Sequence, residues 1–447
     1  MRSALSFFLL LLSTVSARAE LLPLPYSART LPYSGWTPAS RGDTNTIGMG
    51  GATLALSSSI SAAESNPAGY AMVSGSLSAQ INQTTFEDRR LQRSGESIRS
   101  REWGLAVSPP PWGFSIAYYT PISESGTYGL PATGQAVTTE VSLGEYRATA
   151  ARAFLDQTLS IGVGIQYLQA YRELADQHFN SSGWGTTWGL LYRLPLHVIV
   201  GASWSPAVRV APSGNGVPLL PGFDQPVLRP SQLGGGVGWL PNRFFKVGAS
   251  LTYVGATENT ALLADQAVRI GEASTWVPRF GVSYVLAEYT HFKSEAAAGS
   301  YFEQSRLSGQ SNRLHMTAAL EANPYFVNVG AGFDLSSGYQ NFMLSVGIDI
   351  VRTLRTLKII PNDPVPPANQ AFPTPGVNDP NGLPEGVTHG EGPSTQGPSV
   401  KEIGRIIKET PGNIAAKVNG EPTTVEVQEK AKKAKHKKKK KKSPASN

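Results

Sequence analysis

Apolar and polar residues alternate along most of the chain between residues 74 and 352. In LSIGVGIQY, residues 159–167, apolar side chains take every second position, with serine, glycine and glutamine between them. The segments FKVGASLTY (245–253), FVNVGAGFD (326–334) and FMLSVGIDI (342–350) repeat the pattern. A period of two predicts β-strands with one apolar and one polar face.

The alternation predicts fourteen strands. We place them at 74–83, 101–108, 112–122, 139–154, 159–173, 182–194, 197–208, 231–240, 244–257, 275–286, 288–303, 313–323, 325–336 and 339–352. Most are close to the ~9–11 residues with which a tilted strand crosses a bilayer, and aromatic residues recur toward their ends. A soluble β-sandwich is the alternative for an alternating pattern alone.

The connections between these strands alternate in length. Those after even-numbered strands are short, whereas those after odd-numbered strands are mostly long, at 84–100, 123–138, 174–181, 209–230, 258–274 and 304–312. Short turns at one end and long loops at the other are typical of outer-membrane barrels. The predicted fold class is therefore all-β, with a fourteen-stranded antiparallel transmembrane β-barrel at 74–352.

The N-terminus has the features of a secretory signal peptide. Arg2 precedes a short apolar run at 5–12, and the small residues Ala17 and Ala19 precede Glu20. We therefore predict a signal peptide at 1–19 and an N-terminal extension at 20–45. No segment has the ~18 consecutive apolar residues of a transmembrane helix, so the prediction is a protein of the cell outer membrane.

The stretch GMGGATLALSSSISAAESNPAGY, residues 48–70, precedes the strands and does not alternate. Gly48, Gly50 and Gly51 permit a closely packed backbone, and Ser61 and Glu64 have the spacing of a helix capping box. Because a fourteen-stranded barrel encloses a wide lumen, we predict that residues 46–73 form a hatch inside it. The alternative, a phosphate-binding loop, needs a preceding strand and a following helix with a lysine, and the sequence offers neither.

Several stretches resemble the FadL/TodX-type outer-membrane transporters of hydrophobic compounds. They are the hatch stretch itself, LSIGVGIQYLQAYRELADQHFNSSGWGTTWGLLYRLP (159–195), VGASWSP, WVPRFGVSY and YFEQSRLSGQSNRLHMTAALE (301–321). The resemblance covers residues 46–352. It implies a barrel closed by a hatch, with a hydrophobic ligand collected by extracellular loops and released sideways after the hatch shifts.

The resemblance also assigns roles to residues. It implies that the Asn66-Pro67-Ala68 element of the hatch faces the third strand, and that this strand opens laterally at Trp112, Gly113 and Phe114. The hatch and gate candidates are thus Gly48, Gly50, Gly51, Asn66, Pro67 and Ala68.

Charged residues in and near the strands form two kinds of candidate. Arg306, Arg313 and His315, with Glu303, surround the predicted loop between strands 11 and 12, where arginines suit the carboxylate head group of a ligand. A cluster of ion pairs that stabilises the loop is the alternative. Inside the strands lie Glu145, Arg147, His291, Lys293 and Glu295, which fit either a lumen-facing network that holds the hatch or a head-group site.

The C-terminal region separates into a linker and a basic tail. Residues 361–398 hold ten prolines and six glycines, so 353–398 is predicted to be a disordered linker. The tail, 399–447, carries ten lysines between Lys430 and Lys442, and removing them from the net charge of +7 leaves −3 for the rest. The body is therefore not a basic nucleic-acid binder. An even strand count places the tail in the periplasm, where it suits peptidoglycan, anionic lipid or another anionic partner; a solvated tail is the alternative.

No catalytic or metal chemistry is predicted. The chain has no cysteine, and its six histidines lack metal-ligand spacings, so we expect neither an enzyme nor a cofactor. The predicted function is passive outer-membrane transport of hydrophobic small molecules, either long-chain fatty acids or aromatic hydrocarbons. The alternative is a non-transporting structural or assembly platform in the same membrane, whose basic tail binds peptidoglycan or a periplasmic partner.

Overall fold

The computed structural model describes residues 42–354 except for 57–64, 73–76, 89–97, 110, 130–135, 156, 175–176, 214–225, 243, 257–272, 290–291, 305–311, 325 and 351–352. The signal peptide, most of the N-terminal extension, Ser61, Glu64, His291, Arg306, most of the linker and the basic tail lie outside the described residues.

Strands dominate the described part of the chain. They are β1 (Leu77–Asp88), β2 (Ile98–Val107), β3 (Trp112–Gly129), β4 (Ala136–Phe154), β5 (Leu159–Leu174), β6 (Gln177–Leu194), β7 (Val198–Ser205), β8 (Val208–Ser213), β9 (Val227–Arg229), β10 (Gln232–Asn242), β11 (Phe245–Val254), β12 (Thr275–Tyr289), β13 (Phe292–Glu303), β14 (Arg313–Pro324), β15 (Val327–Ser336) and β16 (Tyr339–Asp349). Ahead of them come the short helix α3 (Thr44–Gly48) and the 3₁₀ helix η1 (Pro67–Met72).

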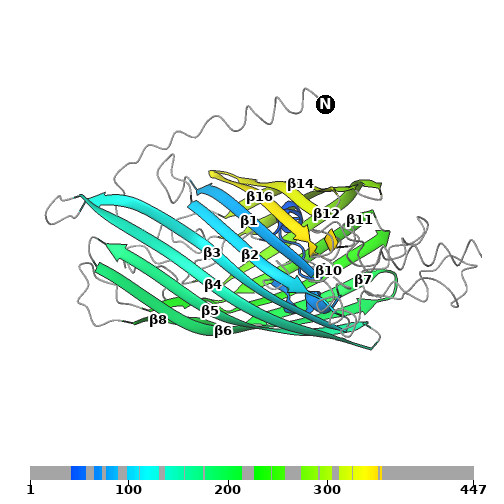
Figure 1. The fold of residues 1–447 in the computed structure, drawn as a ribbon, viewed down its shortest axis with the longest axis horizontal. Helices are drawn as coiled ribbons and strands as arrows, with labels where there is room; N and C mark the ends of the chain where they lie inside the picture. The colour runs from blue at the N-terminus through cyan, green and yellow to red at the C-terminus, as the bar shows by residue number, and fades with distance from the viewer. Residues whose placement is uncertain are drawn as a thin grey trace, which may run out of the picture.

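Fourteen of these strands close into one antiparallel barrel (Figure 1). Neighbouring strands pair in the order β5-β4-β3-β2-β1-β16-β15-β14-β13-β12-β11-β10-β7-β6, and β6 pairs back with β5. The seam between the first and last strands runs from Ser78 opposite Asp349 to Asp88 opposite Tyr339. The predicted fold class is confirmed. The two remaining strands, β8 and β9, pair with each other in a short antiparallel ribbon. β8 also pairs with residues 180–182 of β6, outside the part of β6 that pairs with β7.

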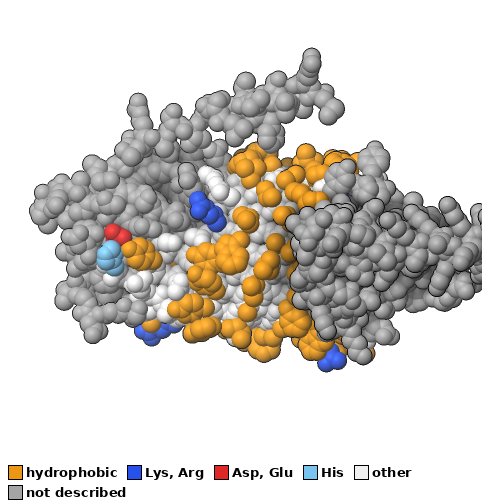
Figure 2. All heavy atoms as spheres, in the orientation of Figure 1, with side chains coloured by type: hydrophobic (Ala, Val, Ile, Leu, Met, Phe, Trp, Pro, Cys, Tyr) orange, Lys and Arg blue, Asp and Glu red, His pale blue; other side chains and the backbone are white. Residues whose placement is uncertain are grey.

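The apolar face of the strands points outward. Ile81, Ile165, Leu190, Leu320 and Val346 are all more than 40% exposed. Figure 2 shows apolar side chains gathered over the middle of the visible surface. The inward positions between them are small or polar, as in Ser160, Thr187 and Ser345. This is the arrangement of a membrane barrel, in which lipid contacts the outside and the lumen is polar.

Aromatic residues mark both edges of this apolar face. On β4, β6 and β12 the exposed pairs Tyr146–Phe154, Trp184–Tyr192 and Trp276–Tyr284 each lie eight residues apart. At the edge nearer the long connections, five rings from β2 to β6 form a ladder of Trp103, Tyr118, Tyr146, Tyr167 and Trp184, with centroids 4.5 to 6.4 Å apart. Such rings belong at the two membrane–water interfaces.

On one side of the barrel, β3 to β6 extend far beyond the other strands (Figure 1). β3 continues to Gly129 and β4 begins at Ala136, so the predicted loop at 123–138 is wrong for most of its length. Likewise β5 and β6 leave only residues 175–176 of the predicted loop 174–181. Residues such as Thr138, Thr139 and Val141 are β-branched and pair in register across β3–β5, which extends the hairpins.

Within the described residues no helix has the length and apolar character needed to cross a membrane.

Candidate functional site

The candidate site is the lumen, where residues 42–56 and 65–72 lie against the inner faces of the strands; we call them the inner segment. Asp43 caps the N-terminus of α3, and its Oδ1 accepts a 2.7 Å hydrogen bond from the Thr46 backbone N–H. Gly50 and Gly51, at φ +64° and +73°, then turn the chain in a conformation that favours glycine. Ile47 and Met49 are completely buried.

Glycines on the barrel wall form a bed for the inner segment. An added Cβ at Gly162 of β5 would lie 2.5 Å from the Ala68 backbone N, and one at Gly189 of β6 would lie 2.7 Å from Pro67 Cδ. The same close approach recurs at wall glycines on seven further strands, namely Gly113, Gly201, Gly234, Gly236, Gly238, Gly248, Gly281, Gly299 and Gly330. The lumen is therefore filled at this level by the backbone and side chains of the inner segment, packed directly on the glycines of the wall.

Side-chain hydrogen bonds fix the inner segment on one side of the barrel. Asn66, fully buried, donates through Nδ2 to the carbonyls of Leu54 and Leu190, both at 3.1 Å. Its Oδ1 accepts from the Ala68 N–H, and Ser160 Oγ donates to the Ala68 carbonyl at 2.7 Å. Asn66 thus joins the two halves of the inner segment to β6.

Two more bonds fix it on the opposite side. Arg279 of β12 donates through Nη1 to the Gly50 carbonyl at 3.0 Å, and Thr317 of β14 donates to the Gly48 carbonyl at 2.7 Å. Gly48 leaves no room for a side chain, since its Cβ would lie 2.5 Å from Ala319 Cβ. The three glycines expected in the hatch therefore all lie against the β12–β14 wall.

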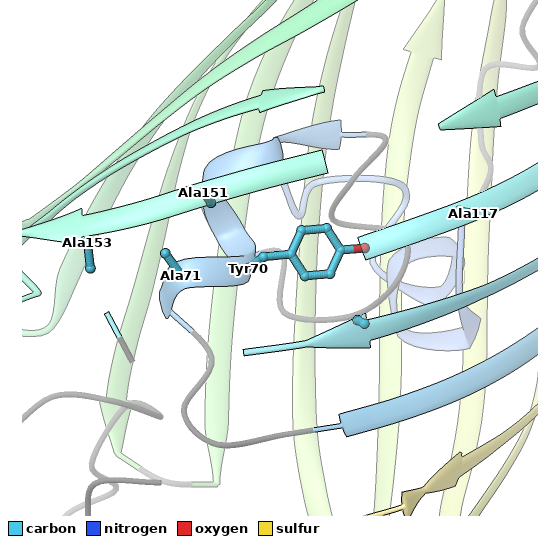
Figure 3. Close-up of a cluster of buried hydrophobic side chains, with 6 residues drawn as sticks. Tyr70, Ala71, Ala117, Ala151 and Ala153 are labelled. Atoms are coloured by element: carbon cyan, nitrogen blue, oxygen red, sulfur yellow. The ribbon is translucent and has the colours of Figure 1, made fainter. Parts of the chain in front are cut away.

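The third strand meets a different residue from the one expected. Tyr70, not Asn66-Pro67-Ala68, lies over Gly113 of β3, and it packs with Ala71, Ala106, Ala117, Ala151 and Ala153 (Figure 3). Asn66-Pro67-Ala68 instead faces β5 and β6, because Gly162 and Gly189 provide the space there.

Where a lateral opening was expected, β3 pairs with β4 throughout, but it pairs with β2 only from Phe114 onward. Trp112 and Phe114 point outward and stack at 6.0 Å; Trp112 and Gly113 have register partners on β4 alone. The irregularity lies further along: between Tyr119 and Ile122 the register with β4 shifts, and β2 shows a matching shift. Thr120 and Pro121 therefore form a bulge, consistent with the missing N–H of proline.

Two of the candidate head-group residues, Arg313 and His315, lie in a buried cluster on β13–β15. His315 contacts Asp334 at 2.8 Å and Glu303 at 3.2 Å, and Arg313 reaches Glu303 at 3.4 Å. Tyr301 donates to Asp334 at 2.6 Å and stacks on His315. Arg313 and His315 thus already have acidic partners, which supports the ion-pair alternative.

The charged residues inside the strands also pair within the lumen. Glu145 lies 2.7 Å from Arg147 and 3.4 Å from Arg229 of β9, a partner that the sequence did not reveal. Across the barrel, Glu295 lies between Lys246 at 2.7 Å and Lys293 at 2.9 Å. Among the residues the structure describes, no three His, Asp or Glu side chains are grouped to hold a metal ion.

No protein-family model matches the chain. No curated protein matches it either.

Solved structures do resemble it. A FadL homologue from Pseudomonas aeruginosa superposes with a TM-score of 0.50 at 11% identity, covering 74% of this chain and all of the homologue. The CymD monoaromatic hydrocarbon channel gives 0.49 at 13% identity, covering 68% and 95%. The toluene transporter TodX from Pseudomonas putida gives 0.45 at 12% identity, covering 70% and 99%.

Proposed function

Because the chain has the fold of the FadL-type channels, we propose that it lies in a bacterial outer membrane and carries hydrophobic small molecules across it without an energy source. The observation that carries the proposal is the inner segment. It fills a closed, lipid-embedded barrel, and the side-chain hydrogen bonds that link Asn66, Ala68, Gly50 and Gly48 to the wall each end on a neutral backbone carbonyl. Breaking these four bonds separates no ion pair.

The physical chemistry suits a passive route. A long apolar ligand gains about 0.8 kcal/mol for each CH₂ group that leaves water, so it partitions inward unaided once a path exists. We infer that Gly48, Gly50, Gly51 and Asn66-Pro67-Ala68 act as the hatch and gate, and that the ligand leaves beside β3. Long-chain fatty acids and aromatic hydrocarbons are the two ligand classes to test.

Uptake measurements test this function. Cells that lack their own transporter would express the intact chain or a chain ending at Arg352, and would receive radiolabelled long-chain fatty acid or toluene. We expect uptake of at least one compound with both chains, because the barrel alone forms the route. Heat-modifiable gel migration would verify that each chain is folded.

The platform alternative gives the opposite result. Folded, surface-located protein would then support no uptake of either compound. Deleting residues 361–447 alone would instead weaken the cell envelope, since the tail would hold the partner.

A further inference from the structure

The ribbon made by β8 and β9 leaves the barrel wall and leans into the lumen. Pro206 and Ala207 separate β7 from β8, and Pro230 lies between β9 and β10. The two breaks lie near the same level of the barrel, because Ser205 at the end of β7 is the register partner of Gln232 at the start of β10. Proline has no N–H for the strand ladder, so regular pairing is interrupted on both sides of the ribbon at one level.

β8 crosses the inner face of β6. At its far end Ala211 pairs with Ser182 and Ser213 pairs with Asn180. Before that, the ribbon passes over two glycines: an added Cβ at Gly183 would lie 3.2 Å from Val210 Cα, and one at Gly185 would meet the Val208 side chain. Val208 and Val210 are accordingly buried, at 3% and 0% exposure.

The ribbon covers an aliphatic part of an otherwise polar lumen wall. Leu143, Leu168 and Ala170 are at most 1% exposed and occupy inward positions on β4 and β5. Leu168 is the register partner of Gly183, and Ala170 that of Leu143, so these residues lie beside the point where Val210 crosses. The neighbouring buried positions Glu145, Gln166 and Ser181 are polar.

One arginine secures the ribbon over this part of the wall. Arg229, at the end of β9, lies 3.4 Å from Glu145 and donates to Gln166, which in turn donates to Thr187. Three register pairs also join β8 to β6. The polar contacts of Arg229 and the buried side chains of Val208 and Val210 thus help to keep the ribbon in place.

We propose that the aliphatic wall of Leu143, Leu168 and Ala170 is the first internal site for an apolar ligand, and that the β8–β9 ribbon is a lid whose Val208 and Val210 occupy that site until a ligand displaces them. The ligand class follows from the lining: an aliphatic chain or ring, since the two valines that it replaces are aliphatic. The inference rests on the transport function proposed above. It differs from the hatch, which closes the lumen nearer the short turns.

A reversible cross-link tests the lid. The natural chain has no cysteine, so Ser182→Cys with Ala211→Cys gives one defined pair. Register partners in antiparallel strands have Cα atoms about 4.5–5.5 Å apart, within the range that a disulfide spans. The matched control is Leu335→Cys with Gln340→Cys, a register pair at the end of β15 and β16, where no movement is proposed.

The measurement is uptake of radiolabelled long-chain fatty acid, and of toluene, in oxidised and reduced cells. We expect the ribbon pair to lose uptake when oxidised and to regain it on reduction, while the control pair transports in both states. Equal uptake by the oxidised and reduced ribbon pair would overturn the lid. No uptake by the reduced proteins and the cysteine-free chain would instead contradict the transport function.

A second variant tests the site with the lid free. Leu168→Ser makes the wall polar, and the apparent affinity of uptake should fall severalfold, whereas Leu344→Ser, on the lipid face of β16, should leave it unchanged. Unchanged affinity in folded Leu168→Ser protein would contradict the assignment of the site.

Discussion

At Gly162 the wall of β5 has no room for even a methyl group. The Ala68 backbone lies where a Cβ would be, and the inner segment is held there by Ser160 and Asn66. The position therefore controls how closely the inner segment approaches the wall.

Replacing Gly162 with alanine should loosen this packing. The added methyl group cannot fit without moving the inner segment, and overpacking of this kind costs about 1–3 kcal/mol. We expect higher ion conductance of the purified protein in planar bilayers, because the displaced segment no longer seals the lumen.

Gly235→Ala is the control for that variant. It lies on the outward face of β10 with nothing within 4 Å of its added Cβ, so conductance should stay at the natural level. Equal conductance of the two variants would mean that the packing of the inner segment on the wall glycines does not control the ion permeability of the lumen.

The sequence alone could not show why these glycines alternate. In LSIGVGIQY they fit the polar face of a strand and would ordinarily be taken to weaken it. Only the folded inner segment reveals that Gly162 and Gly189 make space for Asn66 and Pro67. In contrast, Gly50 and Gly51 could be recognised in advance, since their need for a left-handed backbone is local.

Among the elements, β3 departs most from regular pairing. The alternation predicted the start of the strand at Trp112 but not its continuation beyond Ile122 to Gly129, and Pro121 within it was the available sign of an irregularity. The expected opening at residues 112–114 came instead from resemblance, and the structure places the bulge at Thr120 and Pro121. The ribbon was missed for a different reason: residues 209–230 contain many glycines and prolines, and the pairing of β8 with β6 spans distant residues.

Cross-links at β3 test lateral release. Leu105→Cys with Ile116→Cys would join β3 to β2, and Ile116→Cys with Ala148→Cys would join it to β4. If the ligand leaves beside β3, at least one pair should reduce uptake of labelled fatty acid or toluene when oxidised and restore it when reduced.

The control joins two strands on the other side of the barrel. Ala298 and Ala318 are register partners on the outward faces of β13 and β14, and their cysteine pair should not affect uptake. Full uptake with both β3 pairs oxidised would exclude an exit on either side of this strand near Ile116.

The whole molecule is organised by its outward apolar face. Ile165 lies within it on β5, between the aromatic edges, whereas Gln169 lies on the same face of the same strand beyond the ring ladder. The alternation in the sequence predicted this face, because every second residue of a strand contacts lipid. The sequence did not predict that β3–β6 extend farther than the other strands, which only the strand pairing in the structure shows.

Arginine substitutions should measure the depth of the two positions. Ile165→Arg is expected to lower the free energy of unfolding by about 2–4 kcal/mol, and Gln169→Arg by about 0–1 kcal/mol, since the cost of a charge falls toward the interface. Urea unfolding in lipid vesicles gives both values. Similar losses at the two positions would show that the membrane does not end at the ladder.

The eight-residue spacing of the aromatic pairs also has a consequence for the lipid. Eight residues at about 3.3 Å each span roughly 26 Å along a strand, and roughly 20 Å across the membrane at a tilt near 40°. This is less than the ~30 Å hydrocarbon thickness of an average bilayer. The bilayer next to the barrel must therefore become thinner to match the apolar face. The elastic free energy of that thinning favours insertion of the protein into a thin membrane.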